Sequence, residues 1–172
     1  MKKIFCILLI ACTGCIEEPV PAEINTVKQI DIELLMGHWL ELGQWGRPEY
    51  KQVAAVKIDL SLDDKDMIRM IINKIKFTPY GPLSKSRGRA TWNPDNSGVF
   101  KCALFLNIYR DYYVLYLDPD NTVTLICNKR KTKFWVFSKK PSLSEAQIAG
   151  IIQAMQAIGF DPDKFNWHPT YF

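Results

Sequence analysis

Eight short segments with the character of β-strands follow one another along most of this chain, and this series constrains the fold more than any other feature. Most of these segments are rich in β-branched or aromatic residues, the fourth is more polar, and polar turn residues separate them, as Asp63–Asp66 and Asn93–Gly98 illustrate. The expected strands span residues 39–45, 50–62, 67–77, 83–92, 99–108, 112–117, 123–128 and 133–138. Such short connections join neighbouring antiparallel strands, so the order is that of an up-and-down meander.

A single helix is expected after the strands, with Ser142 as its N-cap and Glu145 at the capping-box position. Apolar residues then recur at helical spacing as far as Gly159. Closure removes the exposed edges of eight strands, and a barrel of that size can hold one small ligand. We therefore predict an all-β fold: an eight-stranded up-and-down antiparallel β-barrel with one C-terminal α-helix packed outside. The alternative is a helix on an open sheet or sandwich, which the uniform hairpin order disfavours.

The N-terminus has the features of a bacterial export signal. Lys2 and Lys3 precede an apolar run over residues 4–11 that is too short to span a bilayer as a helix. The run leads into Ala-Cys-Thr-Gly-Cys, which resembles a lipoprotein signal, where the cysteine after a small residue becomes the lipid-bearing first residue. Cys12 has the better local pattern and Cys15 gives the more usual signal length, so we favour Cys15 and keep Cys12 as the alternative.

Three regions are expected: a lipoprotein signal peptide over residues 1–14, a polar tether over 15–30 and a barrel domain over 31–172. Several acyl chains on one cysteine would anchor the protein stably in a membrane. No aspartate follows either candidate cysteine. By resemblance to lipoproteins of double-membraned bacteria, this places the protein at the outer membrane, facing the periplasm.

Composition and motifs speak against nucleic-acid binding and against catalysis. Lys2 and Lys3 account for two of the four net positive charges, and no basic stripe appears. His38 and His168 are isolated and have no metal-ligand spacing with cysteines, so we expect neither a metal nor a cofactor. No nucleophile or phosphate-binding motif occurs. The expectation is a binding protein and not an enzyme.

Cys102 and Cys127 are the two cysteines that follow the signal region. They fall on the fifth and seventh expected strands, with the sixth between them. Neighbouring strands lie about 4.8 Å apart, so the two cysteines are roughly 10 Å apart, beyond disulfide reach. We predict two buried thiols. Cys102 could act as a nucleophile if it faces inward, although a small hydrophobic role is the simpler interpretation.

Three motifs, taken in order, resemble those of the lipocalins, and most closely those of the bacterial outer-membrane lipocalin lipoproteins. Gly37-His38-Trp39-Leu40-Glu41 is similar to the first signature of that family, residues 113–120 with Asp118 to the second, and residues 134–139 to the third. The resemblance covers roughly residues 31–168 and includes the late helix. It implies a lipocalin calyx in which Gly37, Trp39, Asp118 and Lys139 are the structural signature residues.

The third signature departs from the family at its last position. An arginine usually stands there and stacks across the tryptophan of the first strand, whereas this chain has Lys139 followed by Lys140. A lysine can still form a cation–π contact with Trp39, but it lacks the planar fork of donors. We expect the base of the barrel to close with less geometric definition.

A ligand cavity would be lined by the inward side chains of alternating strands. The inward register of the third strand stays open, and with it the alternative that Arg69 is a surface charge. If inward, Arg69 and Asn73 could receive a carboxylate or phosphate head. The candidate ligand-binding residues are Trp39, Glu41, Arg69, Ile71, Asn73, Phe100, Cys102, Leu104, Trp135 and Phe137.

The resemblance implies a lipid-anchored lipocalin that binds, stores or transports hydrophobic ligands such as fatty acids or lysophospholipids in the cell envelope. One alternative is a structural or interaction lipoprotein whose barrel is filled by its own side chains. A less favoured one is a lipocalin-type isomerase that uses Cys102. The expected partners are a lipid ligand and the membrane, and a homodimer is left open.

Overall fold

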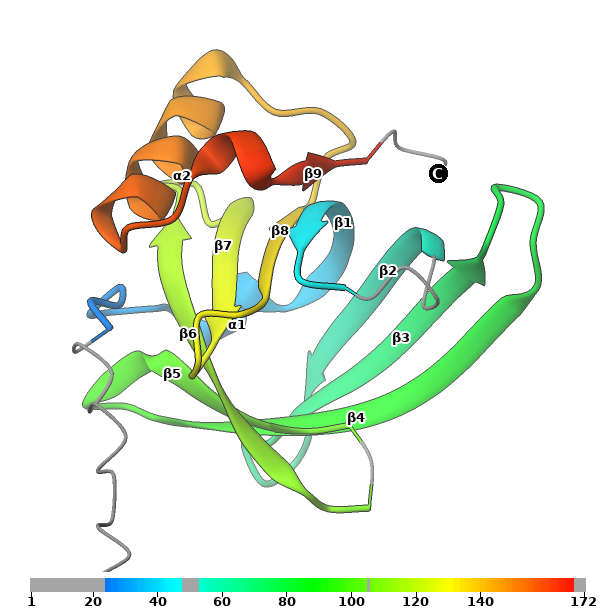
Figure 1. Ribbon diagram of the computed structural model, residues 1–172. Helices are drawn as coiled ribbons and strands as arrows, with labels where there is room; N and C mark the ends of the chain where they lie inside the picture. Colours follow the sequence, from blue (N-terminus) through cyan, green and yellow to red (C-terminus); the bar gives the residue numbers. More distant parts are fainter. Residues whose placement is uncertain (1–23, 48–52, 105, 169–172) are drawn as a thin grey trace, which may run out of the picture.

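Eight antiparallel strands curve around a common interior, with one long helix outside them (Figure 1). The computed structural model describes residues 24–47, 53–104 and 106–168. The predicted signal peptide and both lipidation candidates, Cys12 and Cys15, lie outside the described residues. The strands are β1 (Gly37–Trp45), β2 (Val53–Leu62), β3 (Ile68–Lys76), β4 (Leu83–Asn93), β5 (Asn96–Ala103), β6 (Tyr109–Leu117), β7 (Val123–Asn128) and β8 (Phe134–Ser138).

β1 closes the barrel because it pairs on both sides. Its first half pairs with β2, from Gly37 opposite Leu60 to Leu40 opposite Lys57. It also pairs with β8, from Leu40 opposite Ser138 to Trp45 opposite Phe134. The prediction of an eight-stranded up-and-down barrel with a C-terminal helix outside is confirmed. The cysteines of the fifth and seventh strands are both free, as predicted.

Three short elements were not predicted. A one-turn helix, α1 (Ile32–Leu35), precedes β1, and the side chain of Asp31 caps it by accepting from the amides of Glu33 and Leu34. A two-residue strand, β9 (Asn166–Trp167), follows a 3₁₀ turn, η2 (Pro162–Lys164), and pairs with the second half of β1. β2 pairs only with the first half of β1, and β9 pairs with the second half of the same edge.

The segment before α1 crosses one end of the barrel, which we call the closed end. The amide of Val27 donates to the carbonyl of Val114 at 3.0 Å, and the amide of Ile30 donates to Oγ of Ser97 at 2.7 Å. Ile30 is buried against the barrel core. The predicted tether over residues 15–30 is therefore too long, because residues 24–30 carry apolar side chains that pack into the domain.

The long helix α2 (Glu145–Ala157) covers the outer side of β6, β7 and β8 (Figure 1). Its buried Ile151 and Met155 belong to the same hydrophobic cluster as Phe134 and Val136, the outward residues of β8. The predicted N-cap, Ser142, was wrong. Ser144 caps the helix instead, in a capping box with Gln147, because its hydroxyl accepts from the amide of Gln147 at 3.3 Å.

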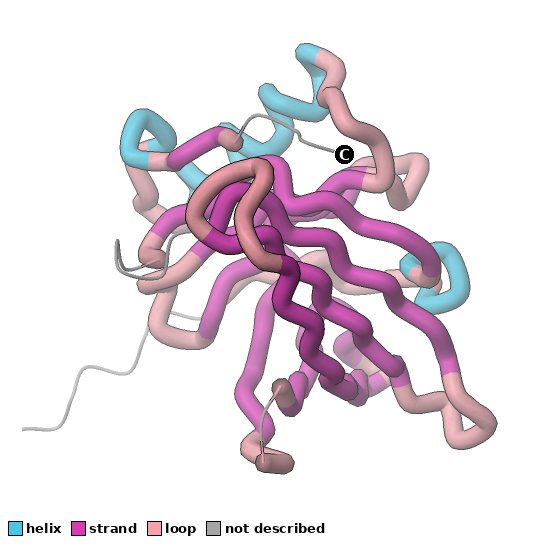
Figure 2. Tube along the Cα trace, turned by 90° about the vertical axis from the view of Figure 1, so that its right-hand side faces the viewer, coloured by secondary structure: helices cyan, strands magenta, loops and turns pink. Residues whose placement is uncertain are grey.

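The opposite end of the barrel, the open end, is where the β3–β4 loop, the β5–β6 loop and the β7–β8 turn lie. The β3–β4 hairpin reaches beyond the neighbouring strands on the right of Figure 1, and its loop faces the viewer in Figure 2. β4 extends past β5 because its pairing with β5 stops where Arg89 meets Ala103. Among the described residues, no helix combines the length and the apolar character that a membrane span requires.

Candidate functional site: a calyx cavity

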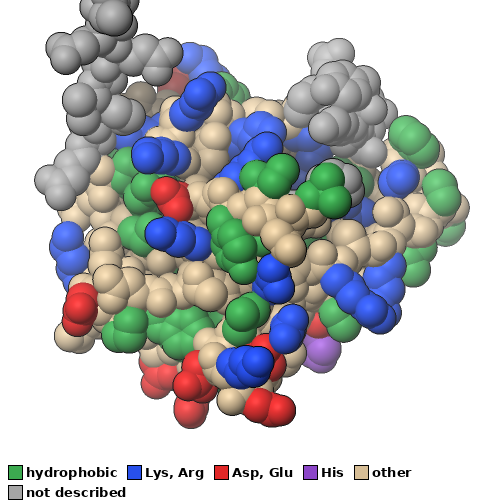
Figure 3. Space-filling view, turned by 90° about the horizontal axis from the view of Figure 1, so that it is seen from below, with side chains coloured by type: hydrophobic (Ala, Val, Ile, Leu, Met, Phe, Trp, Pro, Cys, Tyr) green, Lys and Arg blue, Asp and Glu red, His purple; other side chains and the backbone are tan. Residues whose placement is uncertain are grey.

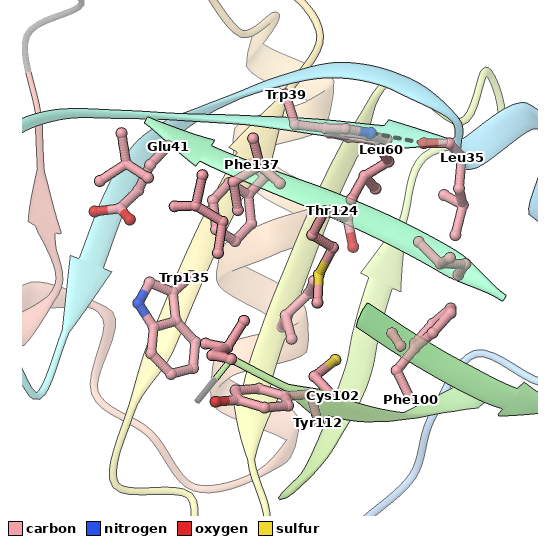
Figure 4. Close-up of a pocket in the computed structure, with 18 of the residues that line it drawn as sticks. Leu35, Trp39, Glu41, Leu60, Phe100, Cys102, Tyr112, Thr124, Trp135 and Phe137 are labelled. Atoms are coloured by element: carbon pink, nitrogen blue, oxygen red, sulfur yellow. Dashed lines mark hydrogen bonds between the residues drawn. The ribbon is translucent and has the colours of Figure 1, made fainter. Parts of the chain in front are cut away.

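A cavity of about 240 Å³ lies inside the barrel (Figure 4). Its wall is mainly aliphatic and aromatic, and the barrel contributes inward side chains from β1 through β8. The lining residues are Leu35, Trp39, Glu41, Arg47, Val56, Ile58, Leu60, Ile68, Met70, Ile72, Lys74, Ala90, Phe100, Cys102, Leu104, Tyr112, Val114, Thr124, Ile126, Trp135 and Phe137.

Trp39 forms the floor of the cavity at the closed end. The ring is only 3% exposed, and its Nε1 donates to the carbonyl of Leu35 at 2.7 Å, which Figure 4 shows as a dashed line. Gly37, two residues earlier, has φ of 110°, a left-handed backbone that glycine adopts without strain. This bend brings α1 across the barrel base, so that the indole finds its acceptor in the preceding helix.

Lys139 completes this floor from the end of β8. Its Nζ lies 5.1 Å from the centroid of the Trp39 ring and donates to the carbonyls of Leu34 at 2.5 Å and Met36 at 3.0 Å. Burial lowers the pKa of Lys139, and the charge of Asp118 opposes that effect. The cation–π contact expected of a lysine at this position is therefore present. The ammonium group also donates to two backbone carbonyls, which supplies part of the hydrogen bonding that the planar fork of an arginine would give.

Asp118 organises the turn between β6 and β7 at the closed end. Its carboxylate accepts from the amides of Thr122 at 2.6 Å and Val123 at 2.7 Å, from the Thr122 hydroxyl at 2.8 Å, and from Nε2 of Gln147 at 2.8 Å. Burial by itself would raise the pKa of Asp118, but these hydrogen bonds hold the pKa below its usual value. The second signature motif thus links the barrel to α2.

A buried carboxylate on β1, Glu41, is the acidic group of the cavity wall among the described residues. Glu41 is 6% exposed, and its carboxylate accepts from Nη2 of Arg47 at 2.6 Å. Nε2 of His168 lies 3.3 Å from the same carboxylate oxygen. His168 reaches this position because its amide donates to the carbonyl of Leu42 at 2.8 Å, as a continuation of β9. The buried carboxylate is thus matched by one permanent cation and one ionisable ring.

Aromatic residues and a thiol form the wall nearer the open end. The rings of Tyr112 and Trp135 are 5.8 Å apart, and Cys102 lies beside Tyr112 in Figure 4. Burial, with a smaller contribution from the Asp111 carboxylate, raises the pKa of the Cys102 thiol to about 12. Burial also raises the pKa of the Tyr112 hydroxyl. At neutral pH both groups are uncharged, so this part of the wall suits an apolar chain.

Seven of the predicted ligand-binding residues lie in the cavity wall. They are Trp39, Glu41, Phe100, Cys102, Leu104, Trp135 and Phe137. Whether they bind a ligand remains a prediction.

The other three, Arg69, Ile71 and Asn73, were placed wrongly. They lie on the outer face of β3, where Arg69 is 53% exposed and pairs with Asp63. The register that sets Ile58 of β2 opposite Ile72 turns Ile68, Met70 and Ile72 inward instead.

Four polar or aromatic lining residues were missed by the sequence reasoning: Arg47, Lys74, Tyr112 and Thr124. Alternation along the sixth and seventh strands, counted from Val114 and Ile126, would have found Tyr112 and Thr124. Lys74 lies on the same face of β3 as Ile68, Met70 and Ile72, and only the strand pairing shows that this face points inward. No local signal marks Arg47, because it follows the last residue of β1.

The fold and the cavity define a class of protein: an eight-stranded calyx that can enclose one small hydrophobic ligand. The Lipocalin-like domain family model matches residues 30–170, and the chain belongs to this family. Outer membrane lipoprotein Blc of Escherichia coli (strain K12) is 26% identical over 163 residues, which cover 93% of this chain and 89% of that protein. Temperature-induced lipocalin-1 of Arabidopsis thaliana is 24% identical, with 86% and 83% covered.

Solved structures of similar proteins agree with the architecture. The allergen Per a 4 from cockroaches has a TM-score of 0.68 at 16% identity, and the comparison covers 88% of this chain and 97% of that one. Insecticyanin from the tobacco hornworm Manduca sexta has a TM-score of 0.67 at 13% identity, with 86% and 85% covered. At such identities the similarity concerns the fold alone.

Proposed function

We propose that this protein is a lipid-anchored lipocalin of the outer membrane that faces the periplasm and binds or carries fatty acids or lysophospholipids. The observation that carries the proposal is the cavity. It combines an apolar interior with a few polar groups on one part of the wall, which is the composition expected for a site that takes an amphiphile.

The cavity wall offers complementary environments for the two parts of such a ligand. Phe100, Val114 and Ile126 provide apolar surface for an acyl chain. Arg47 and Lys74 are the cationic lining residues among those described. Both stand near the open end, since Arg47 follows β1 and Lys74 lies near the end of β3. A carboxylate or phosphate head at the mouth would therefore meet two cationic groups, one of which, Arg47, already pairs with Glu41, and this is the role that the sequence analysis had given to Arg69.

Two observations weigh against the alternative functions. A barrel filled by its own side chains would leave no interior space, whereas about 240 Å³ is present here. An isomerase would need a reactive thiolate, but burial raises the pKa of Cys102 to about 12. The described residues also contain no group of His, Cys, Asp or Glu side chains that could hold a metal ion. A binding role is the function that the cavity supports best.

A chain-length series tests the proposed ligand class. Delipidated protein is titrated with saturated fatty acids and lysophospholipids of increasing length, and binding is followed by the emission of Trp39 and Trp135, which line the cavity. Each buried methylene contributes about 0.8 kcal/mol, so two more carbons should tighten binding by roughly fifteenfold until the cavity is full. Affinity that is absent, or that does not depend on chain length, would refute the carrier function.

Metabolic labelling tests the anchor. Palmitate incorporation should disappear in Cys15→Ser and persist in Cys12→Ser, because Gly14 precedes Cys15 at the end of a signal of ordinary length. The reverse result would move the anchor to Cys12, and absence of label from the wild type would end the lipoprotein proposal. Protease protection in intact cells and in cells with a permeabilised outer membrane tests the periplasmic orientation.

A further inference from the structure

Large apolar side chains are exposed at the open end of the barrel, where a soluble calyx would be expected to present polar loops. Tyr80 is 98% exposed, Leu106 73%, Leu83 67% and Phe77 62%. Leu104, Ile108 and Tyr109 are also exposed. Of the ten exposed large hydrophobic residues in the described part of the chain, seven belong to the β3–β4 and β5–β6 loops and their flanks. Such a concentration marks an interaction surface.

The backbone helps to present two of these side chains. Phe77 has φ of 66° and Leu106 has φ of 45°, which is the left-handed region that large residues rarely adopt. Arg89 supports the β5–β6 loop from the outer face of β4. Its Nη2 donates to Oδ1 of Asn107 at 2.6 Å, and its guanidinium lies 5.7 Å from the centroid of the Tyr109 ring. The contacts from Arg89 thus fix the conformation of the loop that exposes these apolar side chains.

The β3–β4 hairpin at the open end carries basic residues and no acidic ones. No Asp or Glu occurs from residue 67 to residue 94, the segment that contains β3, β4 and the loop between them. Lys76, Lys85 and Arg87 are exposed along this hairpin, and within the described residues none of the three takes part in an ion pair. Figure 3, seen from below Figure 1, shows hydrophobic side chains interspersed with Lys and Arg, and most of the acidic side chains in this view lie at its lower edge.

The closed end differs in both respects. Its β2–β3 turn carries Asp63, Asp64 and Asp66, and Asp120 lies in the β6–β7 turn. These loops hold no exposed large apolar residue among those described. The hairpin at the open end is thus apolar and cationic, whereas these turns at the closed end are acidic.

We propose that the open rim, defined as residues 76–87 together with residues 104 and 106–109, docks on the surface of an anionic phospholipid bilayer. Exposed aromatic and aliphatic side chains enter the interfacial region, and basic residues around them are attracted to anionic headgroups. A second protein partner would need an acidic apolar face, whereas a bilayer supplies both chemistries at once. Docking in this orientation places the cavity mouth against the lipid, so that an amphiphile passes between membrane and cavity without crossing water.

The anchor proposed at Cys15 permits this orientation. Eight residues lie between Cys15 and Ile24, the first described residue, and the nine residue-to-residue steps of an extended chain span up to about 3.5 Å each, or roughly 30 Å. A nine-residue strand such as β1 has a length of about 30 Å. The tether is therefore long enough for the anchor and the rim to reach one membrane from opposite ends of the barrel.

Environment-sensitive labels on the full-length protein test the proposal. Tyr80→Cys and Leu106→Cys place a polarity-sensitive fluorophore at the rim, and Asp64→Cys places it at the closed end as the control. The native Cys127 is buried and Cys102 is half-buried inside the barrel, and their pKa values of about 12 keep both thiols slow to react at neutral pH. The proteins are reconstituted with vesicles of phosphatidylcholine alone or of phosphatidylcholine with phosphatidylglycerol.

Both rim labels should shift to the blue and brighten severalfold with the anionic vesicles, and the Asp64→Cys label should not change. The triple variant Lys76→Glu, Lys85→Glu, Arg87→Glu should lose the shift, whereas Lys65→Glu at the closed end should keep it. Rim labels that do not respond, or that respond equally to both vesicle types, would overturn the proposal. So would a shift of the closed-end label, or a concentration-dependent shift without vesicles, which would indicate a second copy of the chain as the partner.

Fatty-acid titration of the same labelled proteins in vesicle-free buffer keeps this proposal separate from the proposed function. If the rim labels respond to anionic vesicles but the cavity takes up no fatty acid, the carrier function is refuted and docking is supported. If the cavity binds fatty acid but the rim labels do not respond to anionic vesicles, docking alone is refuted.

Discussion

Replacement of Asp118 by Asn should reveal how strongly the β6–β7 turn holds α2 against the barrel. The Asn side chain can keep the two backbone donors, Thr122 and Val123, on its remaining oxygen. Its amide nitrogen would then face the amide nitrogen of Gln147, which now donates to the carboxylate at 2.8 Å. Two donors would oppose each other in a buried position. Hydrogen bonds to charged groups contribute about 1.5–3 kcal/mol, so we expect a loss of roughly 2–3 kcal/mol in the free energy of unfolding.

Asp120→Asn is the matched control, because Asp120 is an exposed carboxylate in the same turn. It should change the stability by less than about 0.5 kcal/mol. Denaturation by urea at pH 7, followed by circular dichroism, measures both variants. If Asp118→Asn were as stable as Asp120→Asn, the carboxylate would not be the link between the turn and the helix.

The pH dependence gives a second, independent check. Hydrogen bonds hold the pKa of Asp118 below its usual value of 3.8 in the folded protein. A carboxyl whose pKa is lower when folded than when unfolded stabilises the fold above the unfolded pKa, and this stabilisation disappears as the pH falls through the folded pKa. The stability difference between wild type and Asp118→Asn should therefore shrink from pH 7 to pH 3. A difference that stays constant over this range would refute the reasoning.

Three further substitutions test the floor and the interior of the cavity. Trp39→Ala should cost roughly 3–5 kcal/mol in urea denaturation, because the ring is buried, whereas Trp167→Ala, at an exposed ring, should cost far less. Lys139→Met should lose about 1–2 kcal/mol with its two carbonyl contacts and its cation–π contact, and Lys139→Arg should recover most of this in the same assay. Cys102→Trp should fill the cavity and abolish fatty-acid binding while near-ultraviolet circular dichroism still reports a folded protein.

The strand order and the outer helix could be predicted because their signals are local and repeated. Apolar alternation between turn residues marks each strand, and the family resemblance adds the closure of the barrel and the inward position of Trp39 and Phe137. The same resemblance located Lys139 beside Trp39, which the structure confirms. These features depend on residues close in sequence or on three motifs in a defined order.

The face of β3 could not be predicted, because both faces of this strand carry isoleucine. Ile68 and Ile72 alternate with Ile71 and Ile75, so a period of two fits either orientation. Only the pairing with β2 and β4 decides between them. Arg69 was assigned to the cavity for that reason.

The prediction of the helix N-cap failed because two positions fit the same sequence pattern. Ser142 is followed three residues later by Glu145, and Ser144 by Gln147, so both serines fit the capping-box pattern. The contact from Gln147 to Asp118, which lies 29 residues earlier in the chain, exists only with the second choice. A tertiary contact of this kind carries no local signal. α1 and β9 are too short for periodicity to detect.

Closure of the barrel by β1 and β8 also has a kinetic consequence. Leu40 meets Ser138, about a hundred residues later in the chain, so the ring cannot form until nearly all of the strands are available. Contacts of such long sequence separation slow the folding reaction, since the entropy of a large loop is lost before the contact stabilises the chain. During synthesis, hairpins such as β3–β4 can form early while the edge of β1 stays unpaired. Under the proposed export across a membrane, this delay would help to keep the chain unfolded, because the barrel cannot close until β8 has been synthesised.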